Sequence, residues 1–383
     1  MLIKRPIYDQ RLKCAGMELI ADKQAQQSKE IYQYFIKIQH TTPKEMPLFV
    51  PYSLKFLVEH PELPIEQPVV LKLHAGDINQ SCSREEIEAC NYRLALLIDN
   101  PQQLAWLNFA DYIALSEHLM AAANVSKVVT YSQAKQRKVI AYDLSHPESF
   151  ERCKMMGMDF FCGDFLFHPT APEKTEIAAS KLNLFELITK LQQQDTNLDS
   201  IVDLIQTDPM LSYQLLKVAN SVAFSGYQDI ESIQQAVVRL GILNLKNWVM
   251  VLSMTNVSNK PLEIVESGLI RAQMAYQLAS TQPELSAQSA YTAGLLSVLD
   301  SLMDSPLANL IDKITLTNEI KLALLSRKGP LGKILDVVIA YEEGHWENLE
   351  DSECFGLDLS KVYMDCLEQV AASRKAIDER GRK

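Results

Sequence analysis

Few residues in this sequence have the types and spacing that catalysis or metal binding requires. Seven cysteines are scattered over 383 residues and form no C-x-x-C pair, which argues against a structural zinc site and against a disulfide framework. No G-x-S-x-G segment marks a nucleophilic serine, and no P-loop lysine motif is present.

Short apolar runs alternate with helix-like segments between residues 1 and 169. Helices are expected at Gln24–Gln39, Ser83–Asn91, Pro101–Phe109 and Pro147–Met156. The expected strands are Ile3–Tyr8, Met17–Ile20, Leu48–Val50, Val69–Leu73, Leu94–Ile98, Tyr112–Leu115, Lys127–Thr130, Val139–Tyr142 and Phe160–Cys162. Short apolar strands that alternate with helices indicate a mostly parallel α/β fold. The number of repeats favours a closed (β/α) barrel over an open sheet.

The sequence pattern changes after residue 169. Two prolines in the polar stretch Phe167–Lys181 predict a linker over residues 170–181. Apolar residues at spacings of three and four then predict an all-helical domain over residues 182–383. Within this domain, Asp208 and Pro209 are expected to begin a helix as N-cap and first residue, and Gly241 is expected to end one. The predicted fold class is therefore α/β followed by all-α.

Composition limits the classes of partner. Apolar residues make up 47% of the chain and charged residues 22%, which predicts a packed protein rather than a disordered one. The formal net charge of -11 disfavours general nucleic-acid binding, because an acidic protein repels phosphate backbones. The N-terminus lacks the apolar core of a signal peptide, and the densest apolar run, Trp248–Met254, is too short to cross a bilayer. We therefore expect a cytoplasmic protein without a membrane partner.

The first half resembles an EAL domain, the barrel that hydrolyses cyclic di-GMP. RPIYDQRLKCAGMELI (residues 5–20) is similar to the EAL opening, with Glu18-Leu19-Ile20 standing where the family has Glu-Ala-Leu. CKMMGMDFFCGDFLFHP (residues 153–169) is similar to the closing segment, and ADYI (residues 110–113) lies between them in the same order. The resemblance implies divalent metals at the C-terminal ends of the strands, where they would polarise a phosphate and activate water.

The second half resembles an HDOD domain, a helical relative of the metal-dependent HD phosphohydrolases. Residues 201–254 carry the resemblance through an Asp-Pro pair, the helix LLKVANS, Phe224 before a turn, and an I-x-x-A-V-x-x-L-G run. Residues 290–307 and 324–347 look like later segments of proteins that join EAL to HDOD in one chain. The resemblance thus implies an N-terminal EAL-like (β/α) barrel followed by an all-helical, HD-related domain.

The positions that the EAL resemblance would assign to metal binding are largely replaced. Lys72 stands where the family has a glutamate, and a lysine ammonium opposes a bound cation. Asp99 comes one residue after the position at which the family has an aspartate, so its side chain is expected on the other face of the strand. The other replaced positions are Pro51 or Tyr52, Leu97, Ile98, Ala114, Ser116, Tyr142 and Cys162. We interpret Glu18-Leu19-Ile20 as a vestigial motif, in which Glu18 is a polar or ion-paired residue near the barrel mouth.

The helical half also lacks the residues that its relatives use. From residue 170 onward histidine occurs once, at His345, and the chain contains no His-Asp dipeptide. Ser297-Val298 stands where the catalytic pair would lie. Because an HD-type hydrolase needs several histidines and aspartates to bind its metals, no metal is expected here. No catalytic residue and no cofactor are expected in either domain.

These losses favour a non-catalytic signalling scaffold that binds protein partners. The resemblance implies roles in motility, biofilm formation or related outputs, in some cases linked to cyclic di-GMP. The alternatives are a receptor that binds cyclic di-GMP without hydrolysis, which the missing ligands disfavour, and an active phosphodiesterase. A homodimer is the default expectation for the oligomeric state.

One short segment is a candidate for the interaction surface. Asn220, Ser221 and Phe224 combine amide, hydroxyl and aromatic groups where a helix ends, a composition found at recognition surfaces. The competing interpretation is that Asn220 and Ser221 satisfy the carbonyl groups of the helix end while Phe224 belongs to the core.

Overall fold

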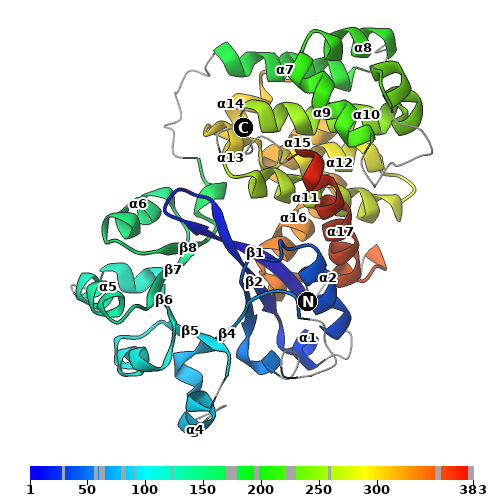
Figure 1. The fold of residues 1–383 in the computed structure, drawn as a ribbon. Helices are drawn as coiled ribbons and strands as arrows, with labels where there is room; N and C mark the ends of the chain where they lie inside the picture. Colours follow the sequence, from blue (N-terminus) through cyan, green and yellow to red (C-terminus); the bar gives the residue numbers. More distant parts are fainter. Residues whose placement is uncertain are drawn as a thin grey trace. The chain divides into compact units, whose positions relative to one another are not determined.

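The computed structural model describes residues 1–27, 31–55, 59, 65–78, 83–89, 91–121, 124–169, 179–193, 198–220, 230–257, 260–349 and 355–377. The chain divides into two compact units, Met1–His168 and Pro169–Lys383 (Figure 1). Most of the predicted linker, residues 170–178, lies outside the described residues. The remaining linker residues, 179–181, belong to the first turn of a helix.

The first unit is a closed barrel whose strands follow one another in sequence order. Strand β1 runs antiparallel to both of its neighbours, β2 and β8, whereas the other neighbouring strands are parallel. The strands are β1 (Leu2–Asp9), β2 (Cys14–Ala21), β3 (Leu48–Pro51), β4 (Val69–His74), β5 (Arg93–Ile98), β6 (Tyr112–Ser116), β7 (Lys138–Leu144) and β8 (Phe160–Gly163). The predicted barrel is confirmed, with one antiparallel strand, β1, in an otherwise parallel sheet.

Helical segments connect the strands of the barrel. They are α1 (Lys23–Gln27), α2 (Ile31–His40), η1 (Tyr52–Leu54), η2 (Ala75–Asp77), α4 (Arg84–Glu88), η3 (Pro101–Phe109), η4 (Glu117–Ala121), α5 (Val125–Ala134), α6 (Pro147–Met155) and η5 (Phe165–Phe167). The predicted strand Lys127–Thr130 is wrong, because these residues lie inside α5. Their β-branched side chains favour a strand, but Val125, Val129 and Ser132 are buried at spacings of four and three. That apolar face makes the segment a helix.

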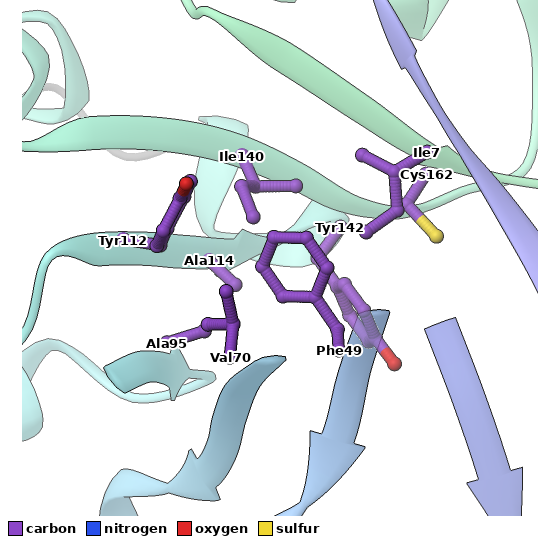
Figure 2. Packing of buried hydrophobic residues seen from close by; sticks show 9 residues of the cluster. All are labelled: Ile7, Phe49, Val70, Ala95, Tyr112, Ala114, Ile140, Tyr142 and Cys162. Atoms are coloured by element: carbon purple, nitrogen blue, oxygen red, sulfur yellow. The ribbon is translucent and has the colours of Figure 1, made fainter. Parts of the chain in front are cut away.

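Side chains fill the interior of the barrel rather than leaving a pore. Phe49, Val70, Ala95 and Ile140 belong to one buried cluster contributed by different strands (Figure 2). Every second residue of a strand points inward. Lys72, two positions after Val70, and Tyr142, two positions after Ile140, therefore face the next layer of the interior, towards the C-terminal ends of the strands. This alternation positions the site described below.

The second unit is largely helical. Its elements are α7 (Ala179–Gln192), α8 (Leu198–Gln206), α9 (Pro209–Ala219), α10 (Ile233–Val257), α11 (Leu262–Ser280), α12 (Ala287–Leu296), α13 (Leu299–Met303), α14 (Leu307–Ile311), α15 (Asn318–Ser326), α16 (Gly329–Glu343), η7 (Trp346–Leu349) and α17 (Leu359–Ile377). Helix α11 is central, since it packs against α12, α16 and α17. The predicted helical domain is confirmed.

Two helix boundaries in this unit follow from single residues. The Asp208 side chain accepts hydrogen bonds from the backbone N–H groups of Met210 and Leu211, and Pro209 is the first helical residue of α9, as predicted. Gly241 interrupts α10 with a left-handed φ of 73°, so the predicted stop is a kink after which a second helical segment continues.

By length and composition alone, one helix among the described residues could cross a membrane. It is Ile233–Asn256 in α10, and half of its apolar stretch is buried inside the protein. A buried core helix of a soluble protein has the same composition, and the Gly241 kink divides this one in two.

Candidate functional site

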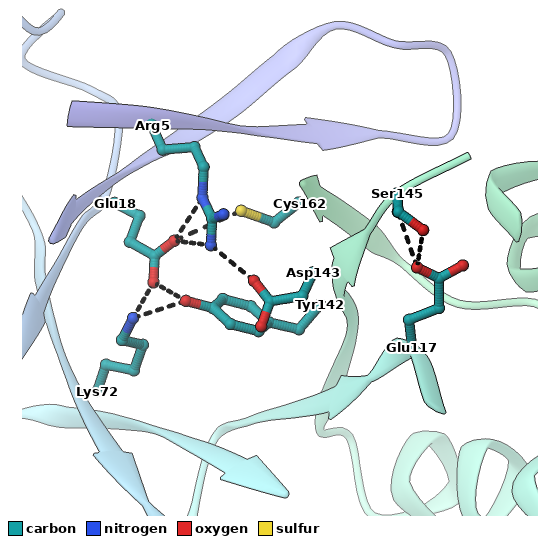
Figure 3. Close-up of polar contacts among 8 residues, drawn as sticks. All are labelled: Arg5, Glu18, Lys72, Glu117, Tyr142, Asp143, Ser145 and Cys162. Atoms are coloured by element: carbon teal, nitrogen blue, oxygen red, sulfur yellow. Dashed lines mark hydrogen bonds and ion pairs between the residues drawn. The ribbon is translucent and has the colours of Figure 1, made fainter. Parts of the chain in front are cut away.

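Four strands bring charged and phenolic side chains together above the barrel interior (Figure 3). Glu18 on β2 lies at the centre and is fully buried. One of its oxygens, Oε1, pairs with the Lys72 ammonium from β4 and accepts a hydrogen bond of 2.6 Å from the Tyr142 hydroxyl of β7. The other, Oε2, accepts hydrogen bonds from Nε and Nη2 of Arg5 on β1, at 3.2 and 3.1 Å. We call Arg5, Glu18, Lys72 and Tyr142 the mouth cluster.

Strand register explains why these residues meet. In the antiparallel hairpin of β1 and β2, Arg5 lies directly opposite Glu18, and opposite charges at such positions stabilise a sheet. Lys72 lies two residues after the inward Val70 on β4, and its Nζ donates to the Tyr142 hydroxyl at 2.9 Å. The cluster thus joins the antiparallel hairpin to two of the parallel strands.

A bulge in β7 brings a further carboxylate to the cluster. The pairing of β7 with β8 shifts between Ala141 and Leu144, and Asp143 in the bulge has a left-handed φ of 57°. Opposite it, Gly163 has a φ of 143°, and a Cβ there would lie 2.2 Å from the carbonyl oxygen of Leu144. Because a bulge redirects side chains, consecutive residues of β7 both reach the mouth, and Asp143 accepts a hydrogen bond of 3.1 Å from Arg5.

The mouth cluster has one stable charge arrangement. Burial alone would raise the pKa of Glu18, but the charges of Lys72 and Arg5, together with hydrogen bonds from Lys72 and Tyr142, hold it at about 2. Burial raises the pKa of the Tyr142 hydroxyl and of the neighbouring Cys162 thiol, so both groups stay neutral. At neutral pH a single carboxylate therefore lies between two basic side chains.

The described residues of the mouth do not fit a divalent metal ion. Magnesium and calcium need several oxygen ligands, but both oxygens of Glu18 already accept hydrogen bonds from within the chain. Leu97 and Ala114, which line the same interior, offer no donor atom. In the described part of the chain, no group of three or more His, Cys, Asp or Glu residues could hold a metal.

A groove of about 620 Å³ lies next to the mouth cluster, at the C-terminal ends of β4 to β7. We call it the mouth groove. Asp99 was expected on the opposite face of β5, but it lines this groove together with Leu97. The expectation was wrong because Asp99 follows Leu97 by two residues. Its side chain therefore points inward, to the same side as Leu97, just beyond the end of the strand. Its carboxylate pairs with Nε2 of His74 at 2.9 Å.

Internal hydrogen bonds fix the other polar groups of the groove. His74 Nδ1 accepts from the Gly76 N–H at 3.1 Å. Glu117 accepts from the N–H and hydroxyl of Ser145 at 2.8 and 2.6 Å (Figure 3). It also accepts a hydrogen bond from the hydroxyl of Ser149. Burial would raise the pKa of Glu117, but these hydrogen bonds lower it. The groove is thus an ordered, acidic surface.

Sequence reasoning missed Arg5, His74 and Glu117. A signal for Arg5 is present, because Arg5 and Glu18 stand at symmetrical distances from the turn after Asp9 in a predicted strand–turn–strand segment. For His74 and Glu117 the signal is weaker, since each occupies the last position of a strand or the first position after one.

The helical unit contains a second buried ion pair near the position expected for an HD motif. Arg271 on α11, which is buried, pairs through Nε with Glu342 of α16. Its Nη1 lies 3.5 Å from the Ser297 hydroxyl, and the adjacent Val298 is fully buried. His345, which is exposed, lies 3.5 Å from the Glu343 carboxylate.

The candidate interaction surface is described in part. The amide of Asn220 donates to the carbonyl oxygen of Ile230 and accepts from its N–H, both at 2.8 Å. Asn220 therefore joins the two ends of segment 221–229. Ser221 and Phe224 lie within that segment and outside the described residues. An interaction role for these three residues stays a prediction.

The comparisons with known proteins identify one domain of the chain. The HDOD domain model matches residues 181–309, in the helical unit that follows the closed barrel. The chain therefore joins a closed barrel to an HDOD domain.

Two curated proteins and one solved structure illustrate what the chain is similar to. Cyclic di-GMP phosphodiesterase CdgJ of Vibrio cholerae is 28% identical over 294 residues, which are 74% of this chain and 67% of the relative. Uncharacterized protein YuxH of Bacillus subtilis is 27% identical over 230 residues, which are 58% of this chain and 56% of the relative. An EAL domain protein from Listeria monocytogenes is 13% identical, with 43% of this chain and 86% of that structure covered at a TM-score of 0.34.

Proposed function

We propose that this chain takes part in cyclic di-GMP-linked signalling without hydrolysing the dinucleotide, and that it acts in the cytoplasm by binding protein partners. Regulation of motility or biofilm formation is the proposed output. The observation that supports the proposal is the state of Glu18, which is fully buried and bound on both oxygens by Lys72, Tyr142 and Arg5.

Hydrolysis of a phosphodiester by such a barrel requires metal ions to polarise the phosphate and activate water. At this mouth, Lys72 and Arg5 supply the positive charge beside Glu18. A divalent cation would therefore have to displace one of them from a buried ion pair. Displacing one partner of a buried pair costs about 3–5 kcal/mol, because it leaves an uncompensated charge. The donor set therefore favours a barrel that folds without metal and does not catalyse hydrolysis.

The helical unit supports the same conclusion. Arg271 lies beside Ser297, where its HD relatives would need metal ligands, and its guanidinium opposes a cation as Lys72 does in the barrel. Grooves and helix faces then remain as the means by which this unit would act on a partner.

The test is incubation of the purified full chain with cyclic di-GMP and either magnesium or manganese. We expect no linear product, and no difference between the unaltered chain and Glu18→Gln. Linearisation that Glu18→Gln abolishes would overturn the proposal. Titration with cyclic di-GMP in the absence of metal distinguishes a receptor from a scaffold, because only a receptor shows saturable binding. Co-purification of the full chain from its host should then recover a protein in stoichiometric amount.

A further inference from the structure

The mouth groove presents acceptors rather than donors to solvent. Its lining includes the carboxylates of Asp99, Glu117 and Asp143, the rings of His74 and His118, and no lysine or arginine. His74 accepts from the Gly76 N–H through Nδ1, and its Nε2 faces the Asp99 carboxylate. The surface therefore attracts positive charge and repels phosphate.

Two of these carboxylates keep an oxygen that no other described residue occupies. Asp99 pairs with His74 through Oδ2, and Asp143 pairs with Arg5 through Oδ1, which leaves Oδ1 of Asp99 and Oδ2 of Asp143. The two side chains are 36% and 55% exposed, so a ligand in the groove can reach them. Two free carboxylate oxygens are therefore available as acceptors.

An independent observation concerns Ser116 at the end of β6. The residue is only 6% exposed and it lines the groove. Its hydroxyl has no hydrogen-bond partner among the described residues, and the hydroxyl oxygen itself stays open to solvent. Buried polar side chains normally have a partner. A serine of this kind, facing a groove, is a hydrogen-bonding position that a ligand can satisfy.

We infer that the mouth groove binds an alkylammonium or guanidinium group, supplied by a basic side chain of a protein partner or by a free polyamine. The multiple N–H donors of such a cation match the free carboxylate oxygens and the Ser116 hydroxyl. This site goes beyond the proposed function and does not depend on it. It gives a partner-binding barrel a binding site for a group of defined chemistry. The absence of hydrolysis is tested by a separate assay, and the result of that assay does not affect this inference.

The experiment is calorimetric titration of the full chain at low salt with two probes. One is spermidine, and the other is the capped peptide acetyl-Gly-Arg-Gly-amide. We expect saturable binding of at least one probe and a loss of about tenfold in affinity for Asp99→Asn, which removes the charge but keeps the size. Tighter binding of the peptide identifies a protein side chain as the source, and tighter binding of spermidine identifies a polyamine.

Two further variants separate the groove from general surface charge. Ser116→Val removes a hydroxyl without changing the net charge and should also weaken binding. Glu88→Gln removes an exposed carboxylate of α4 that does not line the groove, and it should leave the affinity unchanged. The inference is overturned if neither probe saturates, or if Glu88→Gln weakens binding as much as Asp99→Asn does.

Discussion

Glu18→Gln should destabilise the barrel at neutral pH, and the loss should shrink as the solution is acidified. Lys72 and Arg5 hold the pKa of Glu18 at about 2 in the folded chain, whereas an unfolded glutamate has a pKa of about 4.3. A group whose pKa is lower in the folded state contributes stability that is fully present above the unfolded pKa. That contribution is lost as the pH falls from about 4.3 through about 2.

The magnitude follows from the same two values. A difference of about 2.3 pKa units at about 1.36 kcal/mol per unit is roughly 3 kcal/mol in the free energy of unfolding at pH 7. Glu18 is fully buried, so solvent does not screen this contribution. Glutamine also leaves Lys72 and Arg5 without their counter-charge, which adds to the loss.

The assay is urea unfolding of the full chain between pH 3 and pH 7. Amide hydrogen exchange in barrel peptides should follow the transition, because the chain has two units and a single global signal would mix them. Glu88→Gln is the matched control. It removes one partner of the exposed Arg84–Glu88 pair and should cost less than about 0.5 kcal/mol at every pH.

The reasoning on Glu18 is refuted if Glu18→Gln and Glu88→Gln have equal effects at pH 7. It is also refuted if the effect of Glu18→Gln is the same at pH 3 and pH 7. The double variant Glu18→Gln with Lys72→Met provides a second check. Because it removes both charges, it should be less destabilised than the sum of the single variants.

Three other substitutions have defined outcomes. Asn220→Ala should destabilise the helical unit by about 1–2 kcal/mol, because it removes two hydrogen bonds to Ile230; unchanged thermal unfolding would contradict this. Arg271→Met should cost about 3–5 kcal/mol in urea unfolding, because the largely buried Glu342 carboxylate loses its charged partner and keeps only the Ser267 hydroxyl; a cost below about 1 kcal/mol would argue against the pair. Gly163→Ala should destabilise the barrel by at least about 1 kcal/mol, since its Cβ would lie 2.2 Å from a backbone oxygen at a φ of 143°; a stable variant with unaltered exchange at the bulge would show that β7 adjusts.

The barrel was predictable because its strands are short apolar runs whose positions local sequence determines. The prediction went wrong at Lys127–Thr130, where residue type favoured a strand and the spacing of Val125 and Val129 favoured a helix. Over segments this short the two signals conflict, and the buried face of the helix decides.

Within the site, the sequence predicted only which residues replace those of the EAL family. Lys72 and Tyr142 were identified one at a time as substitutions, but their contact across Glu18 depends on barrel closure, which periodicity does not reveal. The contribution of Arg5 depends on the pairing register of the antiparallel β1–β2 hairpin, in a sheet that was expected to be mostly parallel. Asp143 reaches the mouth through a bulge, a one-residue irregularity that strand patterns do not encode.

The covalent attachment of Lys72 and Arg5 has a consequence for how the barrel responds to its surroundings. A bound metal equilibrates with the ion pool of the cell and can be removed by a chelator, whereas a side chain is present at a constant one-to-one ratio. The charge that neutralises Glu18 is therefore independent of magnesium supply. Neither EDTA nor magnesium starvation should change the folding of this barrel, because the chain itself supplies the positive charge beside Glu18.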